Sequence, residues 1–128
     1  MEKVPLPVLI YDGECEFCVR WVKRVTSKLR VEIRREPFQN AVVLEQFGVK
    51  REDAEKAVQW IDESGVRFQG AEAVFQVLLL HRSNGMQEFA KIGLTKPMLR
   101  LAETVYRSIE RNRGWALKVD RFFFGASR

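Results

Sequence analysis

Cys15 and Cys18 are the only cysteines of the chain, and they stand three residues apart. They follow an apolar run, Val8 to Tyr11, that is typical of a buried strand, and residues 12–14 form a turn between the run and the pair. From Cys15 onward the apolar residues recur at the spacing of a helix. A C-x-x-C pair that opens a helix after a strand is typical of a thiol–disulfide redox site. Redox chemistry is therefore the leading hypothesis for this chain.

The spacing of the pair suits a bond that forms and breaks. Residues three apart on a helix have Cβ atoms about 5–6 Å apart, whereas a disulfide needs roughly 3.5–4.5 Å. A bridge can form with local distortion, and strained disulfides are easily reduced. Cys15 falls at the expected helix cap, where free N–H groups and the helix dipole favour a thiolate, so we assign it as the attacking nucleophile. Cys18 falls on the apolar stripe with Trp21, Val22 and Val25, and we assign it as the sheltered, resolving thiol.

Charged residues near the pair act in both directions. Three carboxylates lie within a few residues of the first cysteine: Asp12, Glu14 and Glu16. Like charge opposes thiolate formation, and Arg20 and Lys23 can offset only part of it, so we expect a pair poised toward reduction rather than a strong oxidant. Asp12 has two interpretations, a proton acceptor near the pair or the first residue of an Asp-Gly turn, and we favour the turn.

The cysteine pair also permits two interpretations without redox chemistry. Two small apolar residues can fall three apart by chance, and cysteines can bind zinc. A zinc site normally needs four ligands, but the chain offers two cysteines and one histidine, His81, which we interpret as a packed or surface residue. Zinc shared between two copies is the variant that this count permits. We expect no metal and no cofactor, and the chain contains no Gly-rich phosphate loop, no G-x-S-x-G elbow and no H-E-x-x-H pair.

Length and composition are those of an ordinary globular chain. With 128 residues, 46% hydrophobic and 30% charged, we expect one domain over 1–128, with a core over 5–83 and a helical extension over 86–124. The first five residues start no apolar stretch of the length that a signal peptide needs. The longest apolar run, 77–80, is far too short to span a bilayer. We therefore expect a cytoplasmic protein, in which reducing conditions keep thiols free.

The net charge of +5 is concentrated toward the C-terminus. Residues 86–128 hold nine Lys and Arg against four Asp and Glu, whereas residues 51–85 hold four against six. A basic segment can face nucleic acid, an acidic partner or a membrane surface. We favour a solvated helix face, and nucleic-acid binding is the least favoured function.

Periodicity predicts four strands and a series of helices. The strands fall at 6–11, 31–33, 57–61 and 66–68, and the first helices at 15–29, 40–47 (closed by Gly48) and 71–82 (stopped by 83–85). A further helix is capped by Thr95, has Pro97 in its first turn and ends at Gly114, before a last amphipathic stretch over 115–124. Its packed stripe comprises Met98, Leu101, Ala102, Val105 and Ile109. All three tryptophans fall on apolar segments and are expected in the core: Trp21, Trp60 and Trp115.

The predicted order is β-α-β-α-β-β-α followed by C-terminal helices. This order indicates the α/β class with a mixed four-stranded sheet. It is the order of a thioredoxin-like core, with the C-x-x-C pair in the position that such a core uses for it. The arguments from fold and from chemistry therefore agree, although they use different residues.

Three segments resemble the DCC family of thiol–disulfide oxidoreductases, and together they span nearly the whole chain. The first, Asp12-Gly13-Glu14-Cys15-Glu16-Phe17-Cys18, matches the D-G-x-C-x-x-C hallmark of the family and is quite specific. The second is 68–74, where a Gly and an Ala open a helix, and the third extends from Tyr106 to Asn112-Arg113. The resemblance implies a thioredoxin-like fold and protein-disulfide reductase activity, with Cys15 and Cys18 as the redox residues and Asp12 and Gly13 as their turn.

The resemblance does not assign roles to Asn112 and Arg113: either they bind a partner, or Arg113 bonds to carbonyl groups at a helix end. Two features of true thioredoxins are missing. Leu9 stands where they carry a buried carboxylate, six residues before the first cysteine. No proline lies between Pro37 and Pro97 to supply their cis-proline before the third strand. Because that proline helps to bind an extended substrate chain, its absence favours a narrower range of substrates or a different substrate.

We therefore expect a thiol–disulfide oxidoreductase of the protein-disulfide reductase type, which cycles the dithiol and disulfide forms of Cys15 and Cys18. Its partners would be a protein or small-molecule disulfide and an unidentified electron donor. The alternative is a thioredoxin-like binding or redox-sensing module without catalytic turnover, whose basic helices dock a partner.

Overall fold

The structure is a computed structural model that describes residues 4–124, so the two ends of the expected 1–128 domain, residues 1–3 and 125–128, lie outside the described residues. The four strands in this range are β1 (Val8–Tyr11), β2 (Arg34–Pro37), β3 (Gln59–Ile61) and β4 (Arg67–Gln69). The seven helices between residues 4 and 124 are α1 (Glu16–Thr26), α2 (Ala41–Phe47), α3 (Arg51–Lys56), α4 (Gly70–Leu78), α5 (Asn84–Gly93), α6 (Lys96–Arg111) and α7 (Arg113–Phe124). None of the helices in this range is long and apolar enough to cross a membrane.

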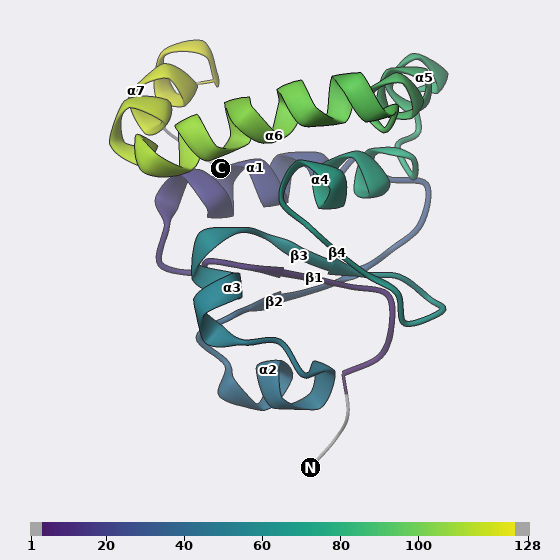
Figure 1. Cartoon of the computed structure of the whole chain (residues 1–128), viewed down its shortest axis with the longest axis vertical. Helices are drawn as coiled ribbons and strands as arrows, with labels where there is room; N and C mark the ends of the chain where they lie inside the picture. Colours follow the sequence, from purple (N-terminus) through teal and green to yellow (C-terminus); the bar gives the residue numbers. More distant parts are fainter. Residues whose placement is uncertain (1–3, 125–128) are drawn as a thin grey trace.

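The strands form one mixed sheet in the order β2-β1-β3-β4. β1 runs parallel to β2 and antiparallel to β3, and β3 pairs with β4 in an antiparallel hairpin. Because parallel neighbours need a crossover connection, α1 crosses one face of the sheet between β1 and β2 (Figure 1). The α/β, thioredoxin-like fold expected from the sequence is confirmed, with α3 as an additional short helix before β3.

Alternation along β1 gives the sheet two apolar faces, because successive side chains of a strand point to opposite sides. Val8 and Ile10 belong to the cluster packed under α2 and α3. Leu9 belongs to the opposite cluster, which contains Trp60 and is covered by α1 and α4, and the partly buried Trp21 packs against it. Figure 1 shows the sheet between these two helical layers, with α6 outside α1 and α4. Burial on both faces holds β1 in place, and with it the loop that leads to the cysteines at the start of α1.

The second strand lies three residues later than expected. The sequence predicted it at 31–33, but β2 begins at Arg34, and Val31 is exposed. β2 is an edge strand of mostly polar residues, so an apolar alternation does not mark it. Parallel pairing with β1 sets its position, since Val8 lies opposite Arg34. Pro37 is tolerated inside it because an edge strand leaves one side unpaired.

Several helix boundaries follow local signals in the sequence. Asn40 caps α2 by accepting a hydrogen bond from the backbone N–H of Val42, and Gly48 ends this helix with a φ of 65°. Thr95 is the N-cap of α6, and Pro97 lies in its first turn. These boundaries agree with the predictions because each depends only on residues within one turn of the helix end.

The helix predicted to end at Gly114 ends at Arg111 instead, and Gly114 lies within the first turn of α7. Two other helices end earlier than predicted because the segments that follow them pair with each other. α1 and α4 stop three and four residues before the predicted ends at 29 and 82. The backbone N–H of Arg30 donates to the Leu80 carbonyl at 2.7 Å, and that of Arg82 donates to the Lys28 carbonyl at 2.9 Å. Ser83, expected only to stop α4, is the N-cap of α5. The sequence did not mark α3, while β3 and β4 lie within two residues of their predicted positions.

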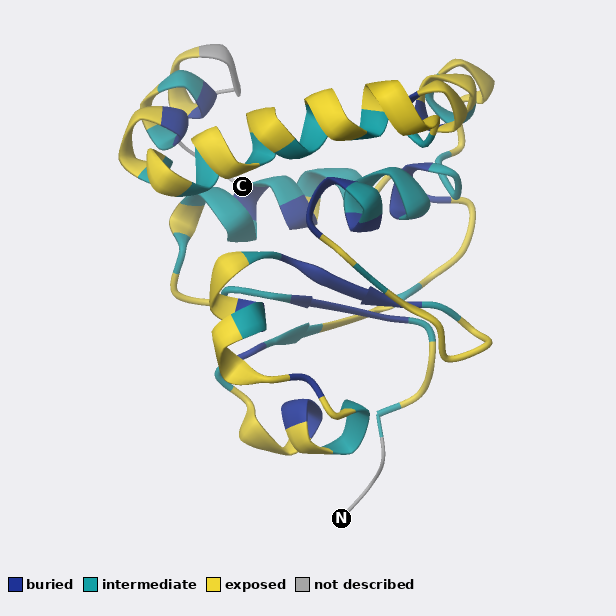
Figure 2. Ribbon diagram, viewed as in Figure 1, coloured by how far each residue is buried: buried dark blue, intermediate teal, exposed yellow. Residues whose placement is uncertain are grey.

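The apolar stripe of α6, which was predicted to be packed, is not buried. Within the described chain no residue of α6 is buried, and Leu101 and Val105 are 57% and 51% exposed. The stripe instead lines an open groove of about 320 Å³ between α4, α5 and α6, with Phe89 on another wall. Trp115 was also expected in the core but is 65% exposed, whereas Trp60 is buried. Both errors arise because α6 and α7 form an outer layer that covers other helices rather than the sheet (Figure 2).

A buried ion pair attaches α7 to α1. The carboxylate of Asp120 accepts hydrogen bonds from Arg20 and Arg24, and Arg20 and Asp120 are only 4% and 6% exposed. The sequence placed Arg20 on the polar side of α1, and α7 covers that side. A second carboxylate attaches α6 to α4, since Glu103 accepts a hydrogen bond from the backbone N–H of Ala71 at 2.8 Å.

Candidate active site

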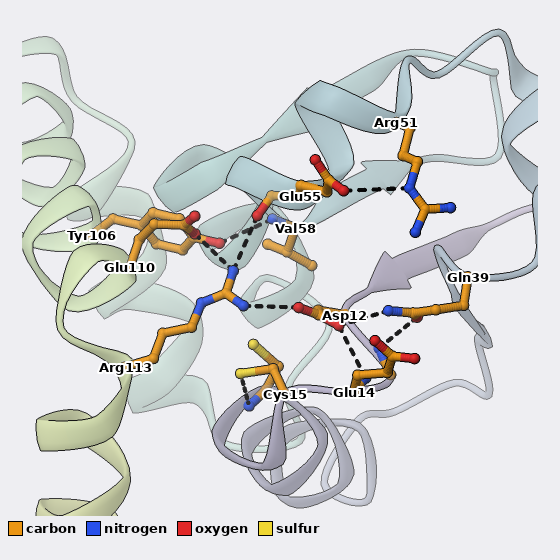
Figure 3. A network of polar contacts seen from close by, with 12 residues as sticks. Asp12, Glu14, Cys15, Gln39, Arg51, Glu55, Val58, Tyr106, Glu110 and Arg113 are labelled. Carbon is orange, nitrogen blue, oxygen red and sulfur yellow. Dashed lines mark hydrogen bonds and ion pairs between the residues drawn. The ribbon is translucent and has the colours of Figure 1, made fainter.

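The two cysteines lie at the start of α1, directly after the loop that follows β1. Cys15 is the N-cap of α1, and its Sγ atom accepts a hydrogen bond from the backbone N–H of Cys18 at 3.3 Å (Figure 3). Both residues are free thiols. The predicted position of Cys15 at the helix cap is confirmed. The expected contrast between an accessible and a sheltered thiol is small, because both residues are half-buried.

The two thiols differ strongly in acidity. The pKa of Cys15 is lowered to about 6, mainly by the hydrogen bond from the Cys18 thiol. The Cys18 backbone N–H and the Arg113 guanidinium also lower it, whereas burial raises it. The same thiol hydrogen bond, burial and the charge of Cys15 raise the pKa of Cys18 well above its usual range. The sequence predicted that acidic neighbours oppose thiolate formation at Cys15, whereas the helix cap favours it. Asp12 does oppose ionisation of Cys15, but it is outweighed.

A tightly bonded turn precedes the first cysteine. Asp12 Oδ1 accepts hydrogen bonds from the backbone N–H of Glu14 at 2.9 Å and from Gln39 Nε2 at 2.8 Å. Gln39 Oε1 in turn accepts a hydrogen bond from the backbone N–H of Gly13 at 2.9 Å. A Cβ atom on Gly13 would lie 2.7 Å from Cβ of Pro37, so the close approach of this turn to β2 requires glycine. Asp12 thus has the turn role that the sequence favoured, and Gln39, which no motif singled out, completes the turn.

The other carboxylate oxygen of Asp12 binds Arg113 at the start of α7. Arg113 Nη1 donates to Asp12 Oδ2 at 2.8 Å, and Nη2 donates to the Glu55 carbonyl and to Glu110 Oε2, both at 3.1 Å (Figure 3). The guanidinium is therefore held from the loop before α1, from α3 and from α6. Of the two roles left open for Arg113, bonding to a helix-end carbonyl is present at Glu55. Asn112 is the C-cap of α6.

Asp12 and Arg113 form a fixed pair of charges near neutral pH. Burial opposes the charge of Asp12, but hydrogen bonds from Gln39, from the Glu14 backbone and from Arg113 together hold its pKa below the usual range. Burial also opposes the charge of Arg113, and its bonds to Asp12 and Glu110 raise its pKa. A carboxylate this acidic is a poor proton acceptor, which argues against the alternative interpretation of Asp12.

Tyr106 of α6 closes the inner side of the site. Its hydroxyl accepts a hydrogen bond from the backbone N–H of Val58 at 2.9 Å, and burial raises its pKa. Val58 and Ala57 directly precede β3, and the only cis peptide bond between residues 4 and 124 is elsewhere, at Leu6–Pro7 before β1. Tyr106, Ala57 and Val58 line a cavity of about 20 Å³ that Cys18 also faces. Cys18 therefore faces α6 and the segment before β3 across this cavity.

A family model for DCC1-like thiol-disulfide oxidoreductases matches residues 9–118. The chain belongs to this family. The match extends from β1 into α7, so it includes both cysteines, the Asp12 turn and Arg113, and it confirms the resemblance seen in the sequence. No curated protein and no solved structure matches the chain.

In this DCC1-like protein the positive charge that balances the acidic neighbours of the cysteines comes from α7. Glu16, next to the first cysteine, pairs with Arg121 at 2.6 Å. Arg20, which was expected to offset the acidic cluster, forms its ion pair with Asp120, and, after the hydrogen bond from Arg121, its charge also helps to lower the pKa of Glu16. The sequence signals for Arg113 and Arg121 were the basic C-terminal segment and the Asn-Arg stretch. Neither signal shows that α7 returns to the start of α1.

His81, the one histidine, lies outside this site. It is half-buried, and its Nδ1 atom accepts a hydrogen bond from the backbone N–H of Ser83 at 2.9 Å. Among residues 4–124, no three His, Cys, Asp or Glu side chains are grouped so that they could hold a metal ion.

Proposed function

We propose that this DCC1-like protein is a thiol–disulfide oxidoreductase of the protein-disulfide reductase type, with Cys15 as the nucleophile and Cys18 as the resolving thiol. The observation that carries the proposal is the hydrogen bond that Cys15 Sγ accepts from the backbone N–H of Cys18 at the helix cap. A sulfur that accepts such bonds is stabilised as a thiolate, and the thiolate is the attacking species in disulfide exchange.

The cycle consists of two exchange steps. In the first, the Cys15 thiolate attacks one sulfur of a substrate disulfide, the substrate S–S bond breaks, and the other substrate sulfur leaves as a thiolate that takes a proton from water. In the second, the Cys18 thiol loses its proton and attacks Cys15 Sγ, so that the mixed disulfide breaks and the remaining substrate sulfur leaves with a proton. Two electrons pass from the dithiol to the substrate. A dithiol electron donor must then reduce the new Cys15–Cys18 disulfide.

The acidity of Cys15 sets the expected redox potential. Its pKa of about 6 lies between the values of about 7 for thioredoxin and about 3.5 for a strong periplasmic oxidant. Stabilising the thiolate stabilises the reduced form, so the pair is a weaker reductant than its acidic neighbours alone predict. We expect a potential of roughly −180 to −270 mV. In the reducing cytoplasm, where we place the protein, such a pair rests largely as the dithiol.

Trapping of mixed disulfides tests the roles of the two cysteines. In Cys18→Ser the resolving thiol is absent, so mixed disulfides should accumulate on Cys15 and be visible by mass analysis under non-reducing conditions. Cys15→Ser is the matched control and should trap nothing, because it lacks the attacking thiol. Equal trapping by the two variants, or none by either, would overturn the assignment. A trap that holds only glutathione would argue against a protein substrate.

A redox titration separates this function from a binding or redox-sensing module. In glutathione buffers of graded potential, the wild-type protein should lose two hydrogens at a single two-electron midpoint, and it should then reduce a protein disulfide repeatedly with dithiothreitol as the donor. A protein that forms no intramolecular bridge at any potential is a binding module. One that forms the bridge without repeated reduction is a sensor.

A further inference from the structure

Cys18 and Arg113 line the same small cavity. Its volume is about 20 Å³, which is room for roughly one water molecule. Asp12 and Tyr106 also line it, and apolar side chains from β1, α1 and α3 form much of the remainder. Bulk water therefore does not separate the guanidinium from the thiol. Charges interact more strongly where water is excluded.

The guanidinium is rigidly placed for such an interaction. Its three acceptors, at 2.8, 3.1 and 3.1 Å, come from three different parts of the fold. The side chain of Arg113 is 28% exposed and that of Asp12 15% exposed, so solvent screens the pair only in part. A charge fixed in this way needs no reorganisation when the sulfur ionises.

The charges around Cys18 change during the cycle. Five ionisable groups face Cys18 or its cavity, with Glu110 behind Arg113: Tyr11, Asp12, Cys15, Tyr106 and Arg113. In the resting dithiol, the hydrogen bond to Cys15, burial and the charge of Cys15 keep Cys18 protonated. When Cys15 enters a mixed disulfide, its negative charge is gone. The opposing effects of Arg113 and Asp12 then decide how readily Cys18 ionises.

We propose that Arg113 activates Cys18 for the second exchange step, and that Asp12 holds the guanidinium in place and limits its effect; this inference rests on the function proposed above. In that step the S–H bond of Cys18 breaks, its Sγ bonds to Cys15 Sγ, and the bond between Cys15 and the substrate sulfur breaks. The proton passes to the departing substrate sulfur. The positive charge beside the cavity stabilises the negative sulfur that forms on this path. The first turn of α7 is thereby part of the active site.

Shifts of opposite sign test this proposal. In a Cys15→Ser background Cys18 is the only thiol, and the ultraviolet absorbance of its thiolate against pH gives its pKa. Arg113→Met should raise this pKa by about one unit, and Asp12→Asn should lower it by about one unit. The double variant should return close to the parent. A purely structural ion pair predicts shifts of the same sign, because both variants break the same contact, and that result would overturn the proposal. Arg111→Met, which removes a nearby exposed cation, should change nothing.

The rate of the second step gives an independent measurement. The Cys15 thiolate attacks one equivalent of dithiobis(nitrobenzoate), which breaks the reagent's S–S bond, releases one thionitrobenzoate and leaves the other bonded to Cys15. Attack by Cys18 then releases this second thionitrobenzoate, and the second phase of the visible absorbance gives the rate of the step. If the pKa of Cys18 rises by one unit, about nine-tenths of the Cys18 thiolate is lost, but the remaining thiolate is about threefold more nucleophilic. Arg113→Met should therefore slow the release about threefold. Arg113→Lys keeps the charge and should restore most of the rate. An unchanged release rate in Arg113→Met would refute the role of Arg113.

The results also separate this proposal from the proposed function. If Cys18→Ser traps no mixed disulfide but the opposite pKa shifts occur, the exchange function is wrong and the charge coupling is correct. If trapping succeeds and the shifts are absent, the exchange function stands without a role for Arg113. Circular dichroism identifies any variant that does not fold. If Arg113→Met does not fold, the single variants Asp12→Asn and Arg113→Lys are measured in its place.

Discussion

Replacement of Asp120 tests how strongly the C-terminal helix depends on one buried carboxylate. Asp120→Ala removes the acceptor that Arg20 and Arg24 share, while both arginines keep much of their surface out of water. Breaking a buried ion pair from one side costs about 3–5 kcal/mol. Because the side chain of Arg24 is 26% exposed and can take up water, we expect a loss near the lower end, about 3 kcal/mol.

Urea unfolding, followed by circular dichroism, measures this loss. With a denaturant slope of about 2 kcal/mol per M, the midpoint of Asp120→Ala should fall by about 1.5 M at pH 7. Burial opposes the charge of Asp120, but its bonds to Arg24 and Arg20 hold its pKa below the usual range in the folded protein. A carboxyl whose pKa is lowered by folding stabilises the protein above its unfolded pKa of about 3.9. The difference between wild type and Asp120→Ala should therefore be complete at pH 7 and shrink below about pH 4.

A matched control removes an ion pair of the same two helices at the surface. Glu16 and Arg121 join α1 to α7, but both side chains are about half exposed. Glu16→Gln should therefore leave the urea midpoint unchanged within error, because exposed ion pairs add little to stability. A loss below about 1 kcal/mol in Asp120→Ala, or the same midpoint shift in both variants, would refute the argument from burial.

Three further measurements test the site. The rate of Cys15 alkylation by iodoacetamide should rise with pH around a midpoint near 6. Cys18→Ala removes the thiol hydrogen bond and should move this midpoint toward 9.0, and equal midpoints would contradict the assigned cause. Gly13→Ala should destabilise the protein by about 1–3 kcal/mol in urea, since its Cβ would lie 2.7 Å from Cβ of Pro37, and an unchanged midpoint would show that the turn can move. Tyr106→Phe should cost about 1–3 kcal/mol by leaving a backbone N–H without its acceptor, and a neutral result would imply that water replaces the hydroxyl.

Local sequence information was sufficient for the features that depend on a few neighbouring residues. The cap at Cys15, the end of α2 at Gly48 and the start of α6 after Thr95 each follow from residues within one helical turn. The buried run of β1 could be predicted because a strand covered on both faces is apolar throughout. The order of strands and helices, and with it the thioredoxin-like fold, followed from these local patterns.

Features that depend on contacts between distant residues were decided by the tertiary structure. Periodicity within α1 could not reveal that α7 buries Arg20. Periodicity within α7 could not reveal that Trp115 remains exposed in the outer layer. The position of β2 follows from its pairing partner, because an edge strand carries little apolar pattern of its own. The acidity of Cys15 comes first from its hydrogen bonds with the nearby Cys18, but part of it comes from Arg113, whose bond to Asp12 spans 101 residues of sequence. Residue types and spacing were enough to identify the atoms that could carry the chemistry. Their charge environment comes from the packing of the C-terminal helices, because Coulomb interactions depend on distance in space and not on separation along the chain.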